Sequence, residues 1–190
     1  MLGALNTPGV TEIISKRSRN HTELMLKFLN YPIKITKKSE YEKISIKGLN
    51  QFKCFKYDVP GDISSASFFI VLTLLSVNSK MIIEKVNINQ SRIGIISILN
   101  KMGADIRLKN KKIYNGEEIA DIYIKSKNNL HAINCPSKLN SSAIDEFLII
   151  FLVAAIDKGI SKFRDLGEMN KKESKRLDLA LKFLKLIGIK

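Results

Sequence analysis

The sequence is poor in the residues from which metal and redox centres are usually built. Its 190 residues include two cysteines and two histidines. Cys54 and Cys135 follow no metal-binding or redox spacing, and His21 and His131 form no ligand pair. We therefore expect two reduced thiols, as is usual in a cytosolic protein, and no metal site.

Long apolar segments are missing as well. The longest apolar run, 147–156, is much shorter than the roughly 20 residues that span a membrane. The N-terminus lacks the basic and then apolar pattern of a signal peptide. With 45% apolar and 26% charged residues, the composition is that of a globular protein and not of a disordered one. We predict a cytoplasmic protein with no membrane partner.

Acidic residues are too few to balance the basic ones. The chain has 32 lysines and arginines against 18 aspartates and glutamates, a net charge of +14. A positive field of this size attracts phosphates, carboxylates or nucleic acid, but it does not determine a fold. Lysine is spread through nearly every segment, so compositional drift and selection for an anionic partner both remain open.

The sequence does contain one supersecondary pattern three times over. An apolar helix leads through a turn into a strand, and the strand leads into an amphipathic helix with basic residues at its entrance. The apolar helices are expected at 2–5, 68–75 and 147–156, the strands at 10–15, 81–88 and 160–166, and the second helices at 17–31, 91–103 and 171–188. Alternating polar and apolar residues predict further strands at 33–36, 43–47, 52–57, 104–108, 112–114, 119–125 and 131–135.

These elements predict an α+β fold. Because the linking helices are apolar all round, we expect them inside, with mixed sheets on the outside. Residues 59–62 favour a turn, and Asp62 or Ser64 can cap the next helix, so we place a boundary between two lobes there. The pattern starts inside a linking helix and stops before the third copy has its last strands. We expect a fragment of a longer protein; the alternative is a compact protein of two and a half repeats.

The three helix entrances are the main candidates for a binding site. Arg19, Arg92 and Lys172 stand where a cation opposes the helix dipole, at a cost of ~0.3–1 kcal/mol each. Beside exposed backbone amides, such cations can form an anion site. The competing interpretation is a set of solvated surface cations.

Residues near the third repeat suit acid–base chemistry. Lys172 and Arg176 are four residues apart and are expected on one helix face, with Glu173 one step round. An ordinary charged helix face explains this spacing better. Asp145 precedes a buried segment, where partial burial favours a raised pKa and the role of a base.

Several segments together resemble the EPSP synthase family of enolpyruvyl transferases. Residues 18–23 are similar to its Ser-Arg-Asp-His-Thr-Glu segment, and residues 59–69 to its Val-Pro-Gly-Asp-Xaa-Ser-Ser-Ala-Ala-Phe-Phe segment. Residues 91–96, 101–105, 144–147 and 172–177 also match, the last against Lys-Glu-Ser-Asp-Arg-Leu. The matches follow the family order along essentially the whole chain, which makes the resemblance specific.

The resemblance implies a partial inside-out α/β barrel of repeated strand-helix-strand-strand units, three to a lobe, with the active site between two lobes. Residues 1–58 would be the C-terminal part of one lobe, and residues 59–190 most of the second lobe, truncated at its C-terminus. The implied reaction transfers the enolpyruvyl group of phosphoenolpyruvate to the 5-hydroxyl of 3-phosphoshikimate, releasing phosphate, in the shikimate pathway to aromatic amino acids. The implied partners are these two small molecules. A monomer without metal, organic cofactor or nucleic acid is expected.

The resemblance also implies site residues. Ser18 and Arg19 would bind the phosphate of 3-phosphoshikimate, and Asp145 would be the base at the attacking hydroxyl. Lys172 would contact 3-phosphoshikimate, and Arg176 the phosphoenolpyruvate anion. These roles are coherent because two polyanionic substrates need concentrated positive charge.

The resemblance implies that Glu173 would help to protonate the enol carbon. The sequence departs from the family pattern at several positions. Asn170 stands where an arginine is common and Lys175 where an aspartate is usual, and Asn20 replaces a frequent aspartate. The family's early Lys-Ser and Arg contacts, its Asn-Ala-Gly-Thr loop, its Ser-Xaa-Gln segment and its late Arg and Lys contacts have no counterpart here. We therefore expect little or no activity from the 190-residue chain alone.

Three alternatives remain at this stage. One is a relative of the transferase that acts on UDP-N-acetylglucosamine, which usually relies on a loop cysteine; neither Cys54 nor Cys135 has a comparable setting. A second is a basic nucleic-acid-binding module, although Phe68, Phe69 and Phe147 fall at apolar helix positions and form no stacking platform. The third is a non-catalytic remnant.

Overall fold

The computed structural model describes residues 1–39, 41–156 and 158–189, and they form two compact units. Unit 1 comprises Met1–Val59 and Lys112–Glu118, and unit 2 comprises Pro60–Lys111 and Ile119–Lys190. Each unit has its own hydrophobic core. None of the described helices is long and apolar enough to cross a membrane.

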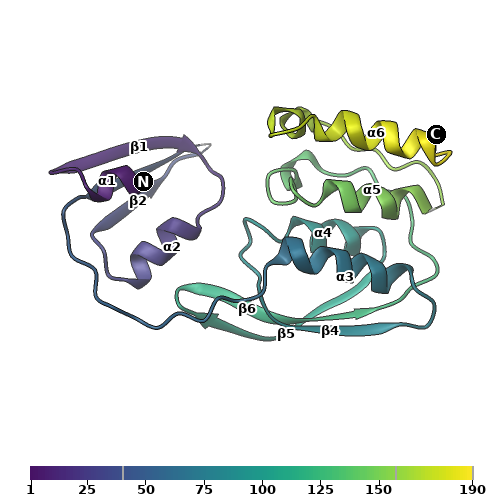
Figure 1. The fold of residues 1–190 in the computed structure, drawn as a ribbon, viewed down its shortest axis with the longest axis horizontal. Helices are drawn as coiled ribbons and strands as arrows, with labels where there is room; N and C mark the ends of the chain where they lie inside the picture. Colours follow the sequence, from purple (N-terminus) through teal and green to yellow (C-terminus); the bar gives the residue numbers. More distant parts are fainter. Residues whose placement is uncertain (40, 157, 190) are drawn as a thin grey trace. The chain divides into compact units, whose positions relative to one another are not determined.

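Unit 1 is a three-stranded antiparallel sheet with two helices (Figure 1). Its elements are α1 (Leu2–Leu5), β1 (Val10–Lys16), α2 (His21–Phe28), β2 (Ile33–Lys37) and β3 (Tyr41–Lys47), with strand order β1-β3-β2. Alternate residues of the central strand, among them Ile44 and Ile46, are buried against Leu26 of α2. The period of two that predicted these strands therefore reflects one buried and one wet face.

Unit 2 contains a second three-stranded sheet with the order β4-β6-β5. Its strands are β4 (Lys80–Asn87), β5 (Asp105–Tyr114) and β6 (Glu117–Lys125), and the tip that joins β5 to β6 belongs to unit 1. The tip is a two-residue turn, Asn115-Gly116, with φ of 50° and 85°. Positive φ at both positions is what a tight hairpin turn requires, and Asn-Gly is the sequence that best supplies it.

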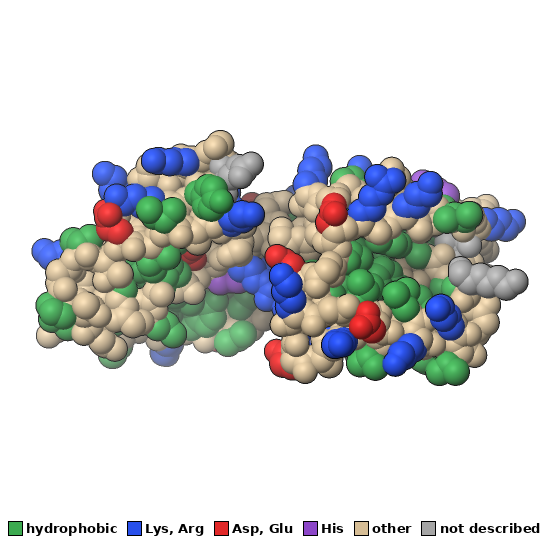
Figure 2. Space-filling model, turned by 90° about the horizontal axis from the view of Figure 1, so that it is seen from above, with side chains coloured by type: hydrophobic (Ala, Val, Ile, Leu, Met, Phe, Trp, Pro, Cys, Tyr) green, Lys and Arg blue, Asp and Glu red, His purple; other side chains and the backbone are tan. Residues whose placement is uncertain are grey.

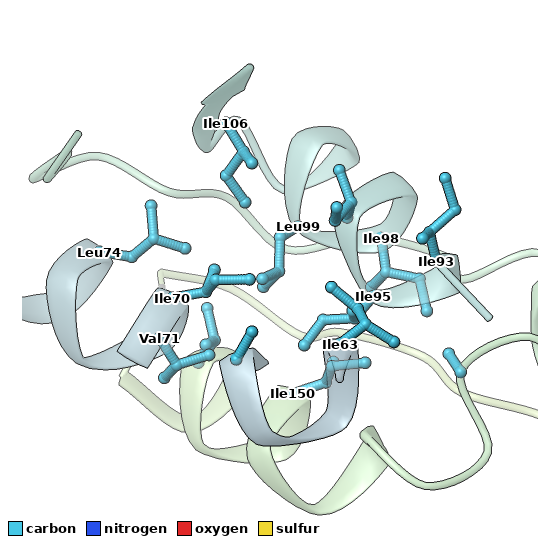
Figure 3. Close-up of a cluster of buried hydrophobic side chains, with 14 of the residues drawn as sticks. Ile63, Ile70, Val71, Leu74, Ile93, Ile95, Ile98, Leu99, Ile106 and Ile150 are labelled. Carbon is cyan, nitrogen blue, oxygen red and sulfur yellow. The ribbon is translucent and has the colours of Figure 1, made fainter. Parts of the chain in front are cut away.

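Helices lie on one side of this sheet in successive layers (Figure 1). They are α3 (Ile63–Leu75), α4 (Gly94–Lys101), α5 (Phe147–Ile156) and α6 (Arg176–Leu186), with short 3-10 turns η1 (Ser137–Leu139) and η2 (Gly167–Lys171). Ile70, Ile98, Leu99 and Ile150 are fully buried in the core of unit 2 (Figure 3), and Phe147 belongs to the same core. The α+β architecture with helices inside and a sheet outside agrees with the expected half of an inside-out barrel.

Three predicted strands are wrong. Residues 52–57 form no strand, and there Phe52 stacks on Tyr31 with ring centroids 4.8 Å apart. Residues 131–135 and 160–166 form only isolated parallel bridges, including Asn134 with Lys162. Alternation predicted the strands at 52–57 and 131–135, and the repeat predicted the one at 160–166, but a strand also needs a continuous partner. The stretches 104–108 and 112–114, expected as two strands, belong to the single strand β5.

The sheets and the helix entrances also differ from expectation. Mixed sheets were expected, but β1 with β3, β2 with β3 and β4 with β6 all pair antiparallel. At β4 a single parallel bridge joins Val86 to Gly61. The second helices begin three to five residues later than predicted, so Arg19, Arg92 and Lys172 precede the helices and do not lie in their first turns. This placement avoids a cation in the first turn of a helix.

Candidate functional site

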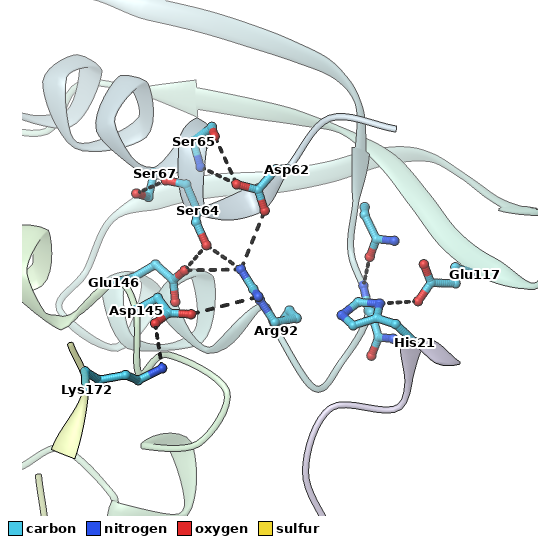
Figure 4. Close-up of polar contacts among 12 residues, drawn as sticks. His21, Asp62, Ser64, Ser65, Ser67, Arg92, Glu117, Asp145, Glu146 and Lys172 are labelled. Atoms are coloured by element: carbon cyan, nitrogen blue, oxygen red, sulfur yellow. Dashed lines mark hydrogen bonds and ion pairs between the residues drawn. The ribbon is translucent and has the colours of Figure 1, made fainter. Parts of the chain in front are cut away.

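Asp145 lies at the centre of a cluster of charged side chains in unit 2 (Figure 4). Its Oδ1 atom is 3.3 Å from Lys172 Nζ and 3.4 Å from Arg176 Nη1. Its Oδ2 atom is 3.9 Å from Arg92 Nη1. The carboxylate is partly buried, with 22% of the side chain exposed. Three cations therefore stabilise negative charge on one half-buried group.

Arg92 connects this carboxylate to two more. Its Nη2 atom lies 3.5 Å from Asp62 Oδ1 and 3.8 Å from Glu146 Oε1, and it donates a hydrogen bond to Ser64 Oγ. Ser64 in turn donates to Glu146 Oε1 at 2.5 Å. Only 1% of the Glu146 side chain is exposed, and a carboxylate so deeply buried needs a paired cation. Arg92, a candidate anion site by sequence, is thus an internal ion-pair partner.

Gly94 allows the segment before Asp145 to reach this position. A Cβ atom at Gly94 would lie 2.5 Å from Ser142 Oγ and 2.8 Å from Ala143 Cβ. The Gly94 amide donates to the Ser142 carbonyl at 3.1 Å. Any side chain here would push the segment away from α4, and the acidic pair of Asp145 and Glu146 follows directly.

Asp62 begins α3, as the sequence predicted. Its Oδ2 atom accepts hydrogen bonds from the Ser65 amide at 2.8 Å and the Ser65 hydroxyl at 3.0 Å, which is N-cap geometry. Burial raises the pKa of Asp62, but the hydrogen bonds from Ser65 and Ser64 and the charge of Arg92 outweigh it. The pKa therefore lies below its ordinary value, and Asp62 is anionic at neutral pH.

Lys172 and Arg176 meet at Asp145 without sharing a helix face. Lys172 has extended backbone, with φ −78° and ψ −173°, and α6 begins only at Arg176. The predicted helix over 171–175 is wrong because Asn170 caps α6 from outside it. Asn170 Oδ1 accepts the amides of Leu177 at 3.0 Å and Asp178 at 3.3 Å. The departure from the family's common arginine thus has a structural role in this chain.

Glu173 lies at the exposed edge of the cluster. Its side chain is 83% exposed, and Oε2 is 3.0 Å from Arg176 Nη2. The hydrogen bond from its own amide, followed by the charge of Arg176, lowers the pKa of Glu173. Glu173 is therefore suited to accept a proton at neutral pH more than to donate one.

An apolar groove adjoins Asp145. Its volume is about 490 Å³, and it is bounded by α3, α5 and α6. Ser64 and Asp145 form its polar edge, while Phe68, Leu148 and Phe183 supply apolar surface. Figure 2 shows apolar side chains gathered in a hollow on the helical side of unit 2, with basic side chains at its edges. The described residues include no group of His, Cys, Asp and Glu suited to a metal ion.

Ser18 and Arg19 belong to unit 1, where they lie exposed in the loop between β1 and α2. The next helical residue, His21, is within 2.5 Å of Glu117 through its Nδ1 atom and the Oε1 atom of the glutamate. This contact fastens the β5–β6 tip to α2 inside unit 1. The roles of Ser18 and Arg19 stay predictions.

The sequence analysis missed part of the cluster. Ser64 was interpreted as a possible capping residue and Glu146 was given no role in the site, but the two are hydrogen-bonded to each other and contact Arg92. The segments around 59–69, 91–105 and 144–147 all resemble the family, and this was the available signal. Their spacing in the sequence did not show that their side chains contact one another.

Known proteins resemble the chain over its whole length. The sequence model of EPSP synthase (3-phosphoshikimate 1-carboxyvinyltransferase) matches residues 1–190. A 3-phosphoshikimate 1-carboxyvinyltransferase of Ruthia magnifica is 41% identical over 173 residues, which cover 91% of this chain and 39% of the relative. The corresponding protein of Hydrogenovibrio crunogenus is 38% identical over 191 residues, which cover 100% of this chain and 43% of the relative.

A solved structure agrees with these matches. EPSP synthase from Acinetobacter baumannii superposes with a TM-score of 0.87 at 36% identity, covering 98% of this chain and 41% of that one. The chain thus spans about two fifths of the length of the relatives that it matches. Matched along all 190 residues in sequence and closely in fold, the chain belongs to the EPSP synthase family.

Proposed function

We propose that this chain contributes Asp145, Lys172, Glu173 and Arg176 to a 3-phosphoshikimate 1-carboxyvinyltransferase site. The reaction would move the enolpyruvyl group of phosphoenolpyruvate to the 5-hydroxyl of 3-phosphoshikimate and release phosphate. The observation that carries the proposal is the convergence of Lys172 and Arg176 on one partly buried carboxylate, Asp145, in a member of this family.

Asp145 would act as the general base. In the addition step it would take the proton of the 5-hydroxyl while the oxygen bonds to C2 of phosphoenolpyruvate and C3 gains a proton. In the elimination step C3 loses a proton and the C2–O bond to phosphate breaks, which restores the double bond. The cations around Asp145 favour a negative charge on its carboxylate, and a base must carry that charge.

Lys172 and Arg176 would bind the anionic groups of the two substrates. Both now contact Asp145, so a bound phosphate or carboxylate would share them with that residue. The shared cations would neutralise charge on the substrates and orient them toward the base. Arg176 also holds Glu173, at 3.0 Å.

Glu173 would exchange a proton with C3 of the enolpyruvyl group. Its lowered pKa makes the anionic form dominant at neutral pH, which suits removal of a proton from the methyl group in the elimination step. For the addition step the residue would have to be protonated in the complex, and a nearby substrate anion favours that change.

Unit 1 would supply Ser18 and Arg19 to the phosphate of 3-phosphoshikimate. In this proposal residues 1–58 are part of one lobe and residues 59–190 are most of the other. The two small molecules would be the partners, and no cofactor takes part in the proposed chemistry. The protein would act in the cytoplasm as a monomer.

An exchange protein tests the proposal. Residues 1–190 would replace the matched region of the Hydrogenovibrio crunogenus relative, and phosphate release from both substrates would be measured. We expect turnover by the exchange protein and little or none by the 190-residue chain alone. A correctly folded exchange protein that releases no phosphate would contradict the proposal, as would an Asp145→Asn variant that keeps full activity.

A further inference from the structure

Arg92 is the third cation beside Asp145, and it takes no part in the proposed chemistry. We infer that Arg92 is a positioning residue that holds the carboxylates of Asp145 and Glu146 together at the start of α5. The inference rests on the proposed function for its catalytic meaning, but the coupling between these side chains is a property of the chain alone.

The two oxygens of Asp145 face different partners. Oδ1 lies toward Lys172 and Arg176, at 3.3 and 3.4 Å, whereas Oδ2 lies toward Arg92 at 3.9 Å. Lys172 and Arg176 are about one third exposed and can reorient toward an anion, but Arg92 is only 15% exposed. If Lys172 and Arg176 turn toward a substrate, Arg92 stays beside Asp145 because its own contacts hold it there.

The surroundings of Arg92 fix the guanidinium at several points. Asp62, the cap of α3, lies 3.5 Å away, and Ser64 of the same helix accepts a hydrogen bond from Arg92. Ser64 also donates to Glu146 at 2.5 Å, so one hydroxyl joins the cation to the buried acid. Planar guanidinium groups suit this kind of multiple contact, which the single ammonium of lysine cannot reproduce.

The arrangement has a chemical consequence for neighbouring acids. Asp145 and Glu146 are adjacent in sequence, and two carboxylates side by side make each other harder to ionise. Arg92 contacts both, so one cation offsets the repulsion between the two carboxylates. Lys172 and Arg176 also pair with Asp145, while Asp62 pairs with Arg92 and Glu173 with Arg176.

The test measures the titration of individual carboxyl groups by NMR in the 190-residue chain, without substrate. The main variant is Arg92→Gln, and Arg92→Lys keeps the charge but loses the planar contacts. Arg107→Gln is the matched control, because Arg107 also pairs with an aspartate, Asp105, but is 70% exposed and lies outside the cluster. Circular dichroism checks the fold of each variant.

We expect Asp145 and Glu146 in Arg92→Gln to bind protons about tenfold more tightly than in the parent chain. Arg92→Lys should fall between the two, and Arg107→Gln should match the parent. Unchanged titration in a folded Arg92→Gln would overturn the inference. An equal change in Arg107→Gln would overturn it too, because the effect would then reflect net charge and not contact.

If Arg92→Gln does not fold, Ser64→Ala and Arg92→Lys decide the matter. Ser64→Ala removes only the hydroxyl between Arg92 and Glu146, so proton binding by Glu146 should tighten several-fold, about threefold or more, with a smaller change at Asp145. Parent-like titration in both variants would refute the positioning role. Because no substrate is used, a failure here is distinct from a failure of the exchange protein to turn over.

Discussion

Lys172 Nζ lies 3.3 Å from Asp145 Oδ1, although 27 residues separate the two in the sequence. The contact joins the segment before α6 to the segment before α5. The proposed base therefore pairs with a cation that is also proposed to bind substrate. This competition leads to the first prediction.

Asp145→Asn should strengthen the binding of inorganic phosphate to the 190-residue chain. The substitution releases Lys172 and Arg176 from a carboxylate, so we expect a gain of about threefold to tenfold, roughly 1 kcal/mol. Isothermal titration calorimetry measures it. Asp105→Asn is the control, since it changes the net charge equally but frees only the exposed Arg107. An equal gain in both variants would rule out competition at Asp145.

Lys172→Met should reduce kcat/KM of the exchange protein by at least about tenfold. Lys172 contacts Asp145, whereas its neighbour Lys171 lies exposed at the end of η2, so Lys171→Met should stay within about twofold of the parent. Steady-state phosphate release gives both values. Equal effects of the two variants would argue for a general loss of positive charge.

Asn170→Ala should destabilise unit 2 by about 1 kcal/mol. The substitution removes the oxygen that accepts the Leu177 and Asp178 amides at the start of α6. Urea unfolding followed by circular dichroism measures the loss. Lys175→Ala is the control, because the Lys175 side chain makes no capping hydrogen bond and only its carbonyl enters the helix. If the two variants lose the same stability, Asn170 is not the cap.

Glu23→Gln should stabilise unit 1 at neutral pH. Glu23 is 5% exposed, its buried Oε2 atom has no hydrogen-bond partner among the described residues, and burial raises its pKa. The folded state therefore keeps its proton to higher pH than the unfolded state. Stability falls as the pH rises from the ordinary value of 4.5 through the raised one, and the loss is complete above it.

The gain from Glu23→Gln at pH 7 is expected to be about 1 kcal/mol and to vanish near pH 4, where the carboxyl is protonated in both states. Urea unfolding at both pH values measures it. Glu12→Gln is the control: Glu12 is exposed and its pKa is lowered, first by a hydrogen bond with Lys43, so its replacement should give no gain. A gain from Glu23→Gln that is the same at pH 4 would exclude ionisation as the cause.

Local rules in the sequence predicted most of the elements. The threefold repeat predicted β1 and β4, and alternation predicted β2, β3 and β6, all within a few residues; the run 147–156 coincides with α5. The Asp62 cap was correct because an N-cap acts over three residues. The late starts of α4 and α6 were missed. For α6 the cap is Asn170, which lies in a separate turn before the helix.

The sequence by itself determined the family, the order of the motifs and the residues available for chemistry. The tertiary structure decided which of them meet: Lys172 and Arg176 at Asp145, and Ser64 and Glu146 at Arg92. These contacts link positions 27 to 82 residues apart. Their geometry depends on how the apolar faces of α3, α4 and α5 pack, and no local pattern in the chain encodes that packing.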